Sequence, residues 1–316
     1  MRRRAFLSAV PALAGCDAIW TITRRNITAL GRYPRRVPHR FRDPRRTDVR
    51  LAVTWIGHAT VLVQLGDRFF LTDPVFSDTV GQFSPRLVEP GLALDVLPEL
   101  TAVVVSHAHF DHLDFRSLEA VAPLTDDLLV PRGTLVYVPP LRGVRAREVR
   151  PWYTVELGPT TRITAVPVRH QGYRYGVDTA WIEGGFTGWV FEHDGLTVYF
   201  GGDTAYDGDA FRRTRARFPR IDLALIPIAP VEPRELARAN HLDGAEAVQA
   251  FFDLGADHMV PIHFDCFPQA ADELGDATAL LRQSMQKRGL DEQRIHILDV
   301  GQSWPPRAEE KKTRRR

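Results

Sequence analysis

The chain has 316 residues, of which 44% are hydrophobic, so it is long enough for one large domain or two small ones with a substantial buried core. Its formal net charge of +2 gives no global argument for nucleic acid as a partner. Two cysteines exclude a disulfide framework and a cysteine-based zinc site, whereas eleven histidines are an unusual number.

The first 16 residues are typical of an export signal. Arg2, Arg3 and Arg4 precede an apolar stretch at residues 5–14, which is too short to cross a bilayer and ends in Leu-Ala-Gly-Cys. This start resembles a bacterial lipoprotein signal, in which Cys16 carries the lipid, and also a twin-arginine signal, which exports folded proteins. We therefore predict a protein of the bacterial cell envelope, lipid-anchored and facing the periplasm or the exterior. The alternative is a cytoplasmic protein whose N-terminus is a frayed helix.

Residues 17–50 are rich in arginine and proline and have little periodicity, which predicts an extended arm. Beside a lipidated cysteine, these arginines would lie on the anionic headgroups of a membrane surface, each contributing about 1 kcal/mol. The alternative is a solvated arm that packs over the domain. The basic residues 305–316 predict a disordered tail, so the folded domain is expected to span residues 51–304.

Three short apolar segments at residues 51–56, 61–65 and 69–72 predict consecutive strands that begin an antiparallel sheet. His58 lies in the turn between the first two strands, and Asp73 follows the third. Each has either a structural role or a role in supporting a metal ligand, as when a carboxylate orients the N–H of a coordinating imidazole. The loop at residues 76–98, punctuated by proline and glycine, is expected to cover the site.

The strongest signal in the chain follows a β-branched run at residues 102–105, which predicts a buried strand. Directly after it come His107, His109, Asp111 and His112. Residues two apart in an extended chain point the same way, so His107 and His109 can reach one ion, whereas Asp111 and His112 come after a turn and can face a second point nearby. Imidazole and carboxylate suit zinc and similar divalent cations. The alternative is a polar loop with solvated histidines.

Later strands end in the same residue types. The alternating run at residues 162–168 is followed by His170, and the run at residues 259–262 by His263. A hairpin at residues 189–200 leads into Gly201-Gly202-Asp203, where the glycines let the backbone approach closely and the carboxylate can bridge two cations. This pattern makes His170 the candidate third ligand of the first metal.

The remaining periodic segments predict helices at residues 115–121, 210–218, 245–254 and 277–288, and strands at residues 128–130, 145–150, 223–228 and 294–298. Asp243 fits the N-cap of the third helix, and His241 just before it is either part of the cap or a proton donor. The glycine- and aromatic-rich residues 171–188 predict a loop beside the site, which either lines a groove for an apolar ligand or packs at a sheet edge.

Taken together, these motifs resemble the metallo-β-lactamase fold over residues 51–301, through His-Ala-His-Phe-Asp-His at 107–112, His170, Gly-Asp-Thr at 202–204 and His263. The chain is most similar to the phospholipase D group that hydrolyses N-acyl-phosphatidylethanolamine. That similarity rests on Trp-Ile-Gly-His-Ala-Thr at 55–60, Leu-Thr-Asp-Pro-Val-Phe-Ser at 71–77, Gly-Asp-Thr-Ala-Tyr at 202–206 and Asn-His-Leu-Asp at 240–243. The resemblance implies an α/β (α+β) fold, an αββα sandwich of two mixed β-sheets flanked by helices.

The resemblance also implies two zinc ions at the strand ends, with iron or manganese as alternatives. His107, His109 and His170 would hold one ion, Asp111, His112 and His263 the other, and Asp203 would bridge them. His58 and Asp73 would support these ligands.

The implied activity is cleavage of a phosphodiester, in a lipid or another small ester, by attack of a metal-bound hydroxide, with Asp111 and His241 as catalytic residues. Alternatives are a lactone or carboxylic-ester hydrolase on the same ions, a di-iron redox protein, and a metal-dependent binding protein of the envelope.

Overall fold

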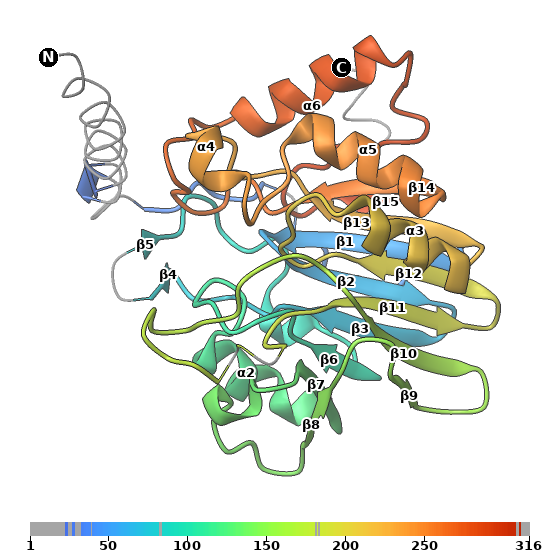
Figure 1. Ribbon diagram of the computed structural model, residues 1–316. Helices are drawn as coiled ribbons and strands as arrows, with labels where there is room; N and C mark the ends of the chain where they lie inside the picture. Colours follow the sequence, from blue (N-terminus) through green and yellow to red (C-terminus); the bar gives the residue numbers. More distant parts are fainter. Residues whose placement is uncertain are drawn as a thin grey trace, which may run out of the picture.

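In a computed structural model of the chain, the described residues are 23–24, 27–28, 33–38, 40–81, 84–180, 182, 184–307 and 310. Two large β-sheets lie face to face, with helices on the outer side of each (Figure 1). Both sheets contain parallel and antiparallel pairs, so the predicted αββα sandwich of two mixed sheets is confirmed.

The first sheet has the strand order β15-β1-β2-β3-β6-β7-β8. Its first half is antiparallel, as predicted, and consists of β1 (Leu51–Gly57), β2 (Thr60–Leu65) and β3 (Arg68–Thr72), with β15 (Ser303–Trp304) at the edge. Its second half is parallel and consists of β6 (Ala102–Val104), β7 (Asp127–Pro131) and β8 (Arg145–Val149). A separate small hairpin pairs β4 (Thr79–Val80) with β5 (Ser84–Pro85).

The second sheet has the strand order β14-β13-β12-β11-β10-β9. Antiparallel pairs join β9 (Thr154–Glu156), β10 (Thr161–Val166), β11 (Gly188–His193) and β12 (Leu196–Phe200). Parallel pairs join β12 to β13 (Ile221–Pro227) and β13 to β14 (Ala256–Ile262).

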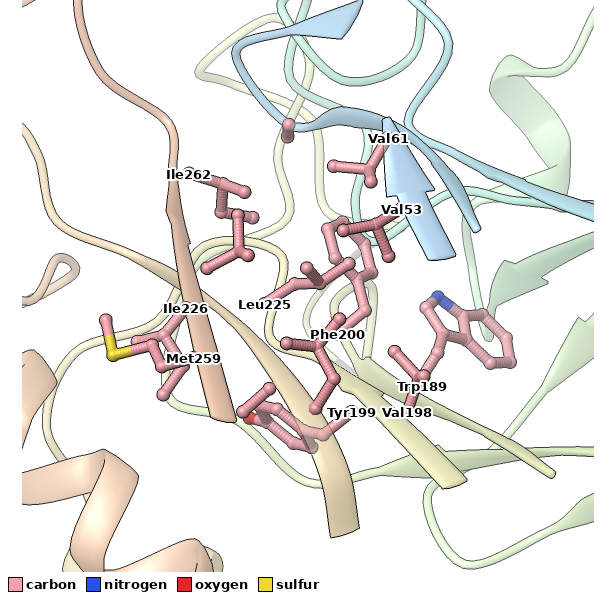
Figure 2. Close-up of a cluster of buried hydrophobic side chains, with 14 of the residues drawn as sticks. Val53, Val61, Trp189, Val198, Tyr199, Phe200, Leu225, Ile226, Met259 and Ile262 are labelled. Atoms are coloured by element: carbon pink, nitrogen blue, oxygen red, sulfur yellow. The ribbon is translucent and has the colours of Figure 1, made fainter. Parts of the chain in front are cut away.

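The main core lies between the sheets, because alternate residues of each strand point inward. In β2, Val61 and Val63 belong to this core, whereas Leu62 belongs to a second cluster on the outer side. Figure 2 shows Val53 and Val61 of the first sheet with Trp189 and other apolar side chains of the second. Full burial of a large apolar side chain contributes about 1.5–3 kcal/mol, so this interface holds the two sheets together.

Helices cover the outer faces. On the first sheet, α2 (Phe115–Val121) packs with Leu118 and Val121. The second sheet is covered by α3 (Gly208–Arg217), α5 (Gly244–Leu254) and α6 (Asp276–Lys287), with the short α4 (Arg234–Ala237) before α5 (Figure 1). Asp243 caps α5 by accepting hydrogen bonds from the backbone N–H groups of residues 245 and 246, as predicted.

The prediction of a strand at residues 294–298 is wrong. Ile295 makes a single parallel bridge to Met259 of β14, and the pairing goes no further. From there the chain crosses from the edge of the second sheet to β15 at the edge of the first, with a turn between Asp299 and Gln302. The two residues of β15 are too few to produce a periodic pattern, so that strand was not predicted.

Described parts of the arm lie against the domain. Arg46 is buried, pairs with Asp48 and donates to the Pro305 carbonyl at 2.6 Å. Beyond residue 304, where a disordered tail is predicted, Glu310 accepts a hydrogen bond from the Ser303 N–H at 2.9 Å. The export signal and Cys16 lie outside the described residues. Among the helices that are described, none combines the length and the apolar character that crossing a bilayer requires.

Candidate metal centre

Nine histidine and aspartate side chains gather where strands of both sheets end. The metal loop, which we define as residues 106–114, follows β6, and the other contributors follow β1, β10, β12 and β14 or precede α5. Their possible ligand atoms form overlapping groups of three or four that lie within 4.8 Å of one another. The nine residues are His58, His107, His109, Asp111, His112, His170, Asp203, His241 and His263. All seven predicted metal ligands are in this set.

The first group joins the start of the metal loop to the end of β10. His107 Nε2 lies 2.8 Å from His109 Nδ1, and His170 Nε2 lies 3.4 Å from the same atom. The three rings are nearly perpendicular to one another, with interplanar angles of 77° to 80°. Three nitrogens from three ring planes thus point at one location.

The second group joins the later part of the metal loop to the end of β14. His112 Nε2 lies 3.1 Å from His263 Nε2, and Asp111 Oδ2 lies 3.7 Å from each of these nitrogens. His58 Nε2 is 2.9 Å from the same Asp111 oxygen, so this imidazole is placed to donate to the carboxylate.

Asp203 lies between the two groups. Its Oδ1 is 3.0 Å from His263 Nε2 in the second group. Its Oδ2 lies between the groups, 3.4 Å from His112 Nε2 in the second and 3.9 Å from His170 Nε2 in the first. Two ligand atoms of one tetrahedral zinc ion, with bonds of about 2.0–2.1 Å, are separated by about 3.3 Å. The observed separations of 2.8–3.9 Å in and between the groups fit two such ions with Asp203 shared.

The tautomers of four imidazoles also fit a metal site. In each of them the Nδ1 has a polar partner and the Nε2 points to the cluster. His170 Nδ1 lies 2.9 Å from the Asn240 carbonyl, and His263 Nδ1 lies 3.0 Å from the Ala229 carbonyl. A ring N–H that donates to a carbonyl leaves the other nitrogen with a lone pair. Facing lone pairs repel each other unless a cation or a proton lies between them.

Asp73 and Ser106 hold the other two imidazoles. His112 Nδ1 is 2.6 Å from Asp73 Oδ2, and the Ser106 hydroxyl donates to that same oxygen at 2.6 Å. His107 Nδ1 lies 2.9 Å from the Ser106 hydroxyl. Asp73 therefore connects to a histidine of each group. Ser106 was missed by sequence reasoning, and its only signal is its place directly before His107.

Backbone geometry at three of these residues is unusual. His58, Asp73 and His263 have φ values of 56°, 34° and 67°, in the left-handed region that non-glycine residues rarely adopt. Such conformations cost about 1–3 kcal/mol and cluster at functional sites. Each lies just after a strand, so the turn of the backbone brings its side chain to the centre.

Gly202 lets the end of β12 approach the metal loop. Its φ is +56°, and a Cβ atom at this position would lie 2.3 Å from the Ser106 Cβ. Only glycine fits this contact, and the contact sets the position of Asp203, the next residue.

The electrostatics of the centre favour positive charge. Burial lowers the pKa of His107 and of His170 well below the usual range, which keeps both imidazoles neutral. Burial alone would raise the pKa of Asp203, but His263 and His112 outweigh it and hold that pKa well below the usual range. Burial would likewise lower the pKa of His263, but Asp203 and Asp111 raise it to about 9. Without a metal, a proton on His263 supplies part of the positive charge that this site favours.

His241 lies at the open side of the centre. Its Nδ1 is 3.5 Å from Asp203 Oδ2 and has no hydrogen-bond partner among the described residues. Burial lowers its pKa to about 4. The imidazole is therefore neutral at pH 7 and is not held by the α5 cap, which Asp243 provides.

Two cavities are lined by neighbours of the centre's residues. One of about 470 Å³ is lined by Arg169, Tyr206 and Arg238 with two glutamates, and Arg169 is the residue before His170. The other, of about 160 Å³, is lined by apolar residues that include Leu87 and Phe267, by three carboxylates, and by Gln269, which contacts His263 at 3.0 Å. One is rich in charge and the other is partly apolar.

The two loops expected near the site are close to it at the points described. Residue 81, in the loop after β4, lies against Phe110 of the metal loop. In the loop at residues 171–188, the Tyr173 ring packs edge-on against His109, with 4.6 Å between centroids. Tyr175 of that loop is 59% exposed, so it does not close over an apolar groove. Phe83 and Trp181 lie outside the described residues.

Comparisons with known proteins agree with this geometry. A family model described as "Beta-lactamase superfamily domain" matches residues 68–264. The chain is 30% identical over 275 residues to N-acyl-phosphatidylethanolamine-hydrolyzing phospholipase D 1 of Caenorhabditis elegans, covering 80% of this chain and 75% of that one. It is 29% identical to a metal-dependent hydrolase of Pyrobaculum aerophilum, covering 69% of this chain and 86% of that one.

A Mycobacterium tuberculosis protein is 32% identical over 72% of this chain, which spans 62% of its length. Among solved structures, a possible metal-dependent hydrolase of Veillonella parvula has a TM-score of 0.62 at 18% identity, covering 81% of this chain and 99% of that one. This last similarity supports the fold alone.

Proposed function

The chain belongs to the β-lactamase superfamily, among its metal-dependent hydrolases, and from this premise we propose that it is a di-zinc phosphodiesterase that cleaves a phospholipid. The observation that carries the proposal is the position of Asp203, whose carboxylate oxygens lie within 3.9 Å of imidazole nitrogens from both groups.

In this proposal, His107, His109 and His170 bind one zinc ion, and Asp111, His112 and His263 bind the other. Asp203 would be shared by the two ions, while Asp73 and His58 orient His112 and Asp111. Two such ions, when bound, polarise the phosphoryl oxygens and lower the pKa of water. The imidazole and carboxylate donors also suit iron and manganese, which metal analysis of the purified protein distinguishes from zinc.

Side chains of the protein are assigned to the proton transfer and to the placement of the attacking water. Hydrolysis adds the oxygen of water to phosphorus and breaks the bond to the leaving alkoxide, which must take up a proton. His241 faces the centre, has no other partner there and is neutral at pH 7. We assign it to hold the phosphate through a ring N–H, or to take up the proton that the attacking water releases and pass it to the leaving oxygen. Asp111, which His58 holds in place, is assigned to steer the attacking water as well as to bind metal.

A phospholipid fits the surroundings better than a small polar ester does. The larger cavity offers two arginines and two glutamates, which suit a zwitterionic headgroup, and the smaller one offers an apolar wall with carboxylates beside it. The C. elegans relative is named for hydrolysis of N-acyl-phosphatidylethanolamine, which supports the same class of substrate.

The test is hydrolysis of N-acyl-phosphatidylethanolamine in vesicles by the zinc-loaded protein, with the lipid products identified by mass spectrometry. We expect phosphatidic acid and an N-acylethanolamine to appear together. Parallel assays with lactones and p-nitrophenyl carboxylic esters test the alternative. Turnover of these with no phosphodiester cleavage would replace the proposal with an ester or lactone hydrolase.

We further propose that Cys16 is lipidated and that the Arg-rich arm lies on the membrane, in the cell envelope. The motif Leu-Ala-Gly-Cys and the arginines of residues 17–50 support this. In a bacterial host, labelled fatty acid should be incorporated into the protein and not into Cys16→Ser. Equal recovery of both proteins in the soluble fraction would contradict it.

A further inference from the structure

The loop that follows His170 buries its charged residue and exposes its apolar ones. Arg174 is 6% exposed, whereas Tyr175 is 59% and Val177 is 90% exposed. This is the reverse of ordinary burial, in which arginine stays in water. A buried arginine needs specific partners to offset its lost hydration.

Those partners are two carbonyls of the metal loop. Arg174 Nη1 donates to the Ala108 carbonyl and to the Leu113 carbonyl, each at 2.8 Å. The two carbonyls stand on either side of residues 109–112, which contain three of the assigned ligands. One nitrogen therefore spans the segment that presents them.

Aromatic rings hold the guanidinium in this position. Its central carbon lies 4.4 Å from the centroid of Phe110, in the metal loop, and 4.2 Å from that of Phe115, at the start of α2. Cation–π contacts attract the guanidinium to both ring faces, and the attraction is stronger where the charge is desolvated. They restrict the side chain to the orientation that reaches both carbonyls.

The backbone at residue 174 is anchored in turn. Asp178 accepts from the Arg174 N–H at 3.0 Å and from the Tyr175 N–H at 2.6 Å. It also accepts from the hydroxyl of Tyr137, at the end of a 3-10 turn (Leu135–Tyr137), and the Tyr137 ring packs in the cluster around α2. The arginine thus connects the metal loop to the first sheet through a second route.

Within the metal loop itself, the described backbone hydrogen bonds are few. The His109 carbonyl accepts from the His112 N–H at 3.1 Å and from the Leu113 N–H at 2.9 Å. These bonds close one turn but do not set the distance between the two ends of the loop.

We propose that Arg174 is a positioning residue, which fixes the span from Ala108 to Leu113 and so presents His109 and Asp111 to two different metal ions. The inference rests on the proposed function, because it takes these residues as ligands. Apolar packing alone would fill the same space with a leucine or a methionine and would avoid the desolvation of a cation.

The test compares Arg174→Met, which keeps the volume and removes the donors, with Arg174→Lys, which keeps a charge and up to three donors. In the metal-free protein, hydrogen exchange at the amides of His112 and Leu113 should be at least about 10-fold faster in Arg174→Met. Loss of metal to a chelator should be about 10- to 100-fold faster, the range seen when the support of a metal ligand is removed. Arg174→Lys should recover part of both effects.

Arg162→Met is the matched control, because that exposed arginine lies on β10 and pairs with Glu192. It should match the unmodified protein in both measurements. Tyr137→Phe removes the hydroxyl that donates to Asp178 and leaves Arg174 in place. It tests the same positioning role if Arg174→Met does not fold, and we expect a smaller increase in hydrogen exchange.

Unchanged exchange and unchanged metal release in Arg174→Met, or in Tyr137→Phe where Arg174→Met does not fold, would overturn the proposal. Metal analysis of the unmodified protein separates this result from failure of the proposed function. If the unmodified protein binds no metal, the proposed metal-dependent hydrolysis is refuted. Hydrogen exchange in the metal-free state would still test whether Arg174 positions the metal loop.

Discussion

Strand β14 carries a histidine near each end, and the two have different surroundings. After its last residue, His263 Nε2 lies 3.1 Å from His112 Nε2, inside the candidate metal centre. Near its start, His258 Nδ1 lies 3.1 Å from His296 Nε2, beside Trp304. The same nitrogen separation therefore occurs twice on one strand.

The difference lies in what surrounds each pair. At His263, the Ala229 carbonyl occupies the other ring nitrogen, and Asp111 and Asp203 bring negative charge. At His258, one imidazole can donate to the other, and among the described residues the pair belongs to no group of three possible ligands. Close imidazoles alone do not make a metal site; carboxylates and tautomers fixed by carbonyls do.

Removal of the shared carboxylate should break the centre most severely. In Asp203→Ala, we expect loss of bound metal together with a fall in kcat/KM of at least about 1,000-fold, since metal catalysis contributes several kcal/mol. Metal per protomer by mass spectrometry and hydrolysis of bis(p-nitrophenyl) phosphate measure the two effects. Full turnover with both metals retained would refute the bridging role.

His241 should separate metal binding from proton transfer. His241→Ala is expected to lower kcat by about 100-fold or more while metal content stays unchanged, as is typical when a side chain that takes part in proton transfer is lost. The same metal analysis and phosphodiester assay apply. If the variant loses an ion instead, His241 is a ligand, in the group that it forms with His170 and Asp203.

Asp73 should have an intermediate effect. Asp73→Asn keeps the shape but weakens the hold on His112 Nδ1 and on Ser106, so metal affinity should fall by about 10- to 100-fold. Competition with a chromophoric chelator measures this. Equal affinity in the variant would show that the backbone alone orients the imidazole.

In the metal-free protein, the free energy of unfolding should depend on pH through His263, which follows β14. The pKa of His263 is raised to about 9, above its value of about 6.5 in an unfolded chain. A raised pKa stabilises the fold fully below pH 6.5, and this contribution is lost as the pH rises through 9. Urea unfolding should therefore show a loss on the order of 1 kcal/mol between these values, which bound zinc suppresses.

The smallest effect is expected at the other end of the strand. His258→Ala should leave metal content and activity unchanged and lower the free energy of unfolding by about 1 kcal/mol, the usual cost of a half-buried substitution. Thermal unfolding and metal analysis check both. A change in bound metal would mean that the two ends of β14 are not distinct.

Sequence reasoning identified the residues that gather at the candidate metal centre because their signals are local. His107 and His109 share a side of an extended segment, and His170, Asp203 and His263 each follow an apolar run. What holds those side chains was harder to predict. The carbonyls of Asn240 and Ala229 are backbone atoms, which any residue type supplies, and Arg174 meets residues 108 and 113 only after the chain has folded.

Of the fold, most individual strands followed from hydrophobic periodicity, whereas the two mixed sheets were implied by the family resemblance and the order of their strands was not predicted. The prediction of a strand at residues 294–298 was wrong because periodicity does not determine the path of the chain between the sheets. Its sequence suits a strand, but the chain leaves β14 to reach β15. Tertiary path rather than propensity decided that segment.

His112 and His263 meet although 151 residues separate them. During synthesis, the metal loop leaves the ribosome long before its last partner exists, so a nascent chain has only part of a binding site. Under the proposed function, capture of both ions would then mark a polypeptide that has been translated past β14 and whose two halves have docked.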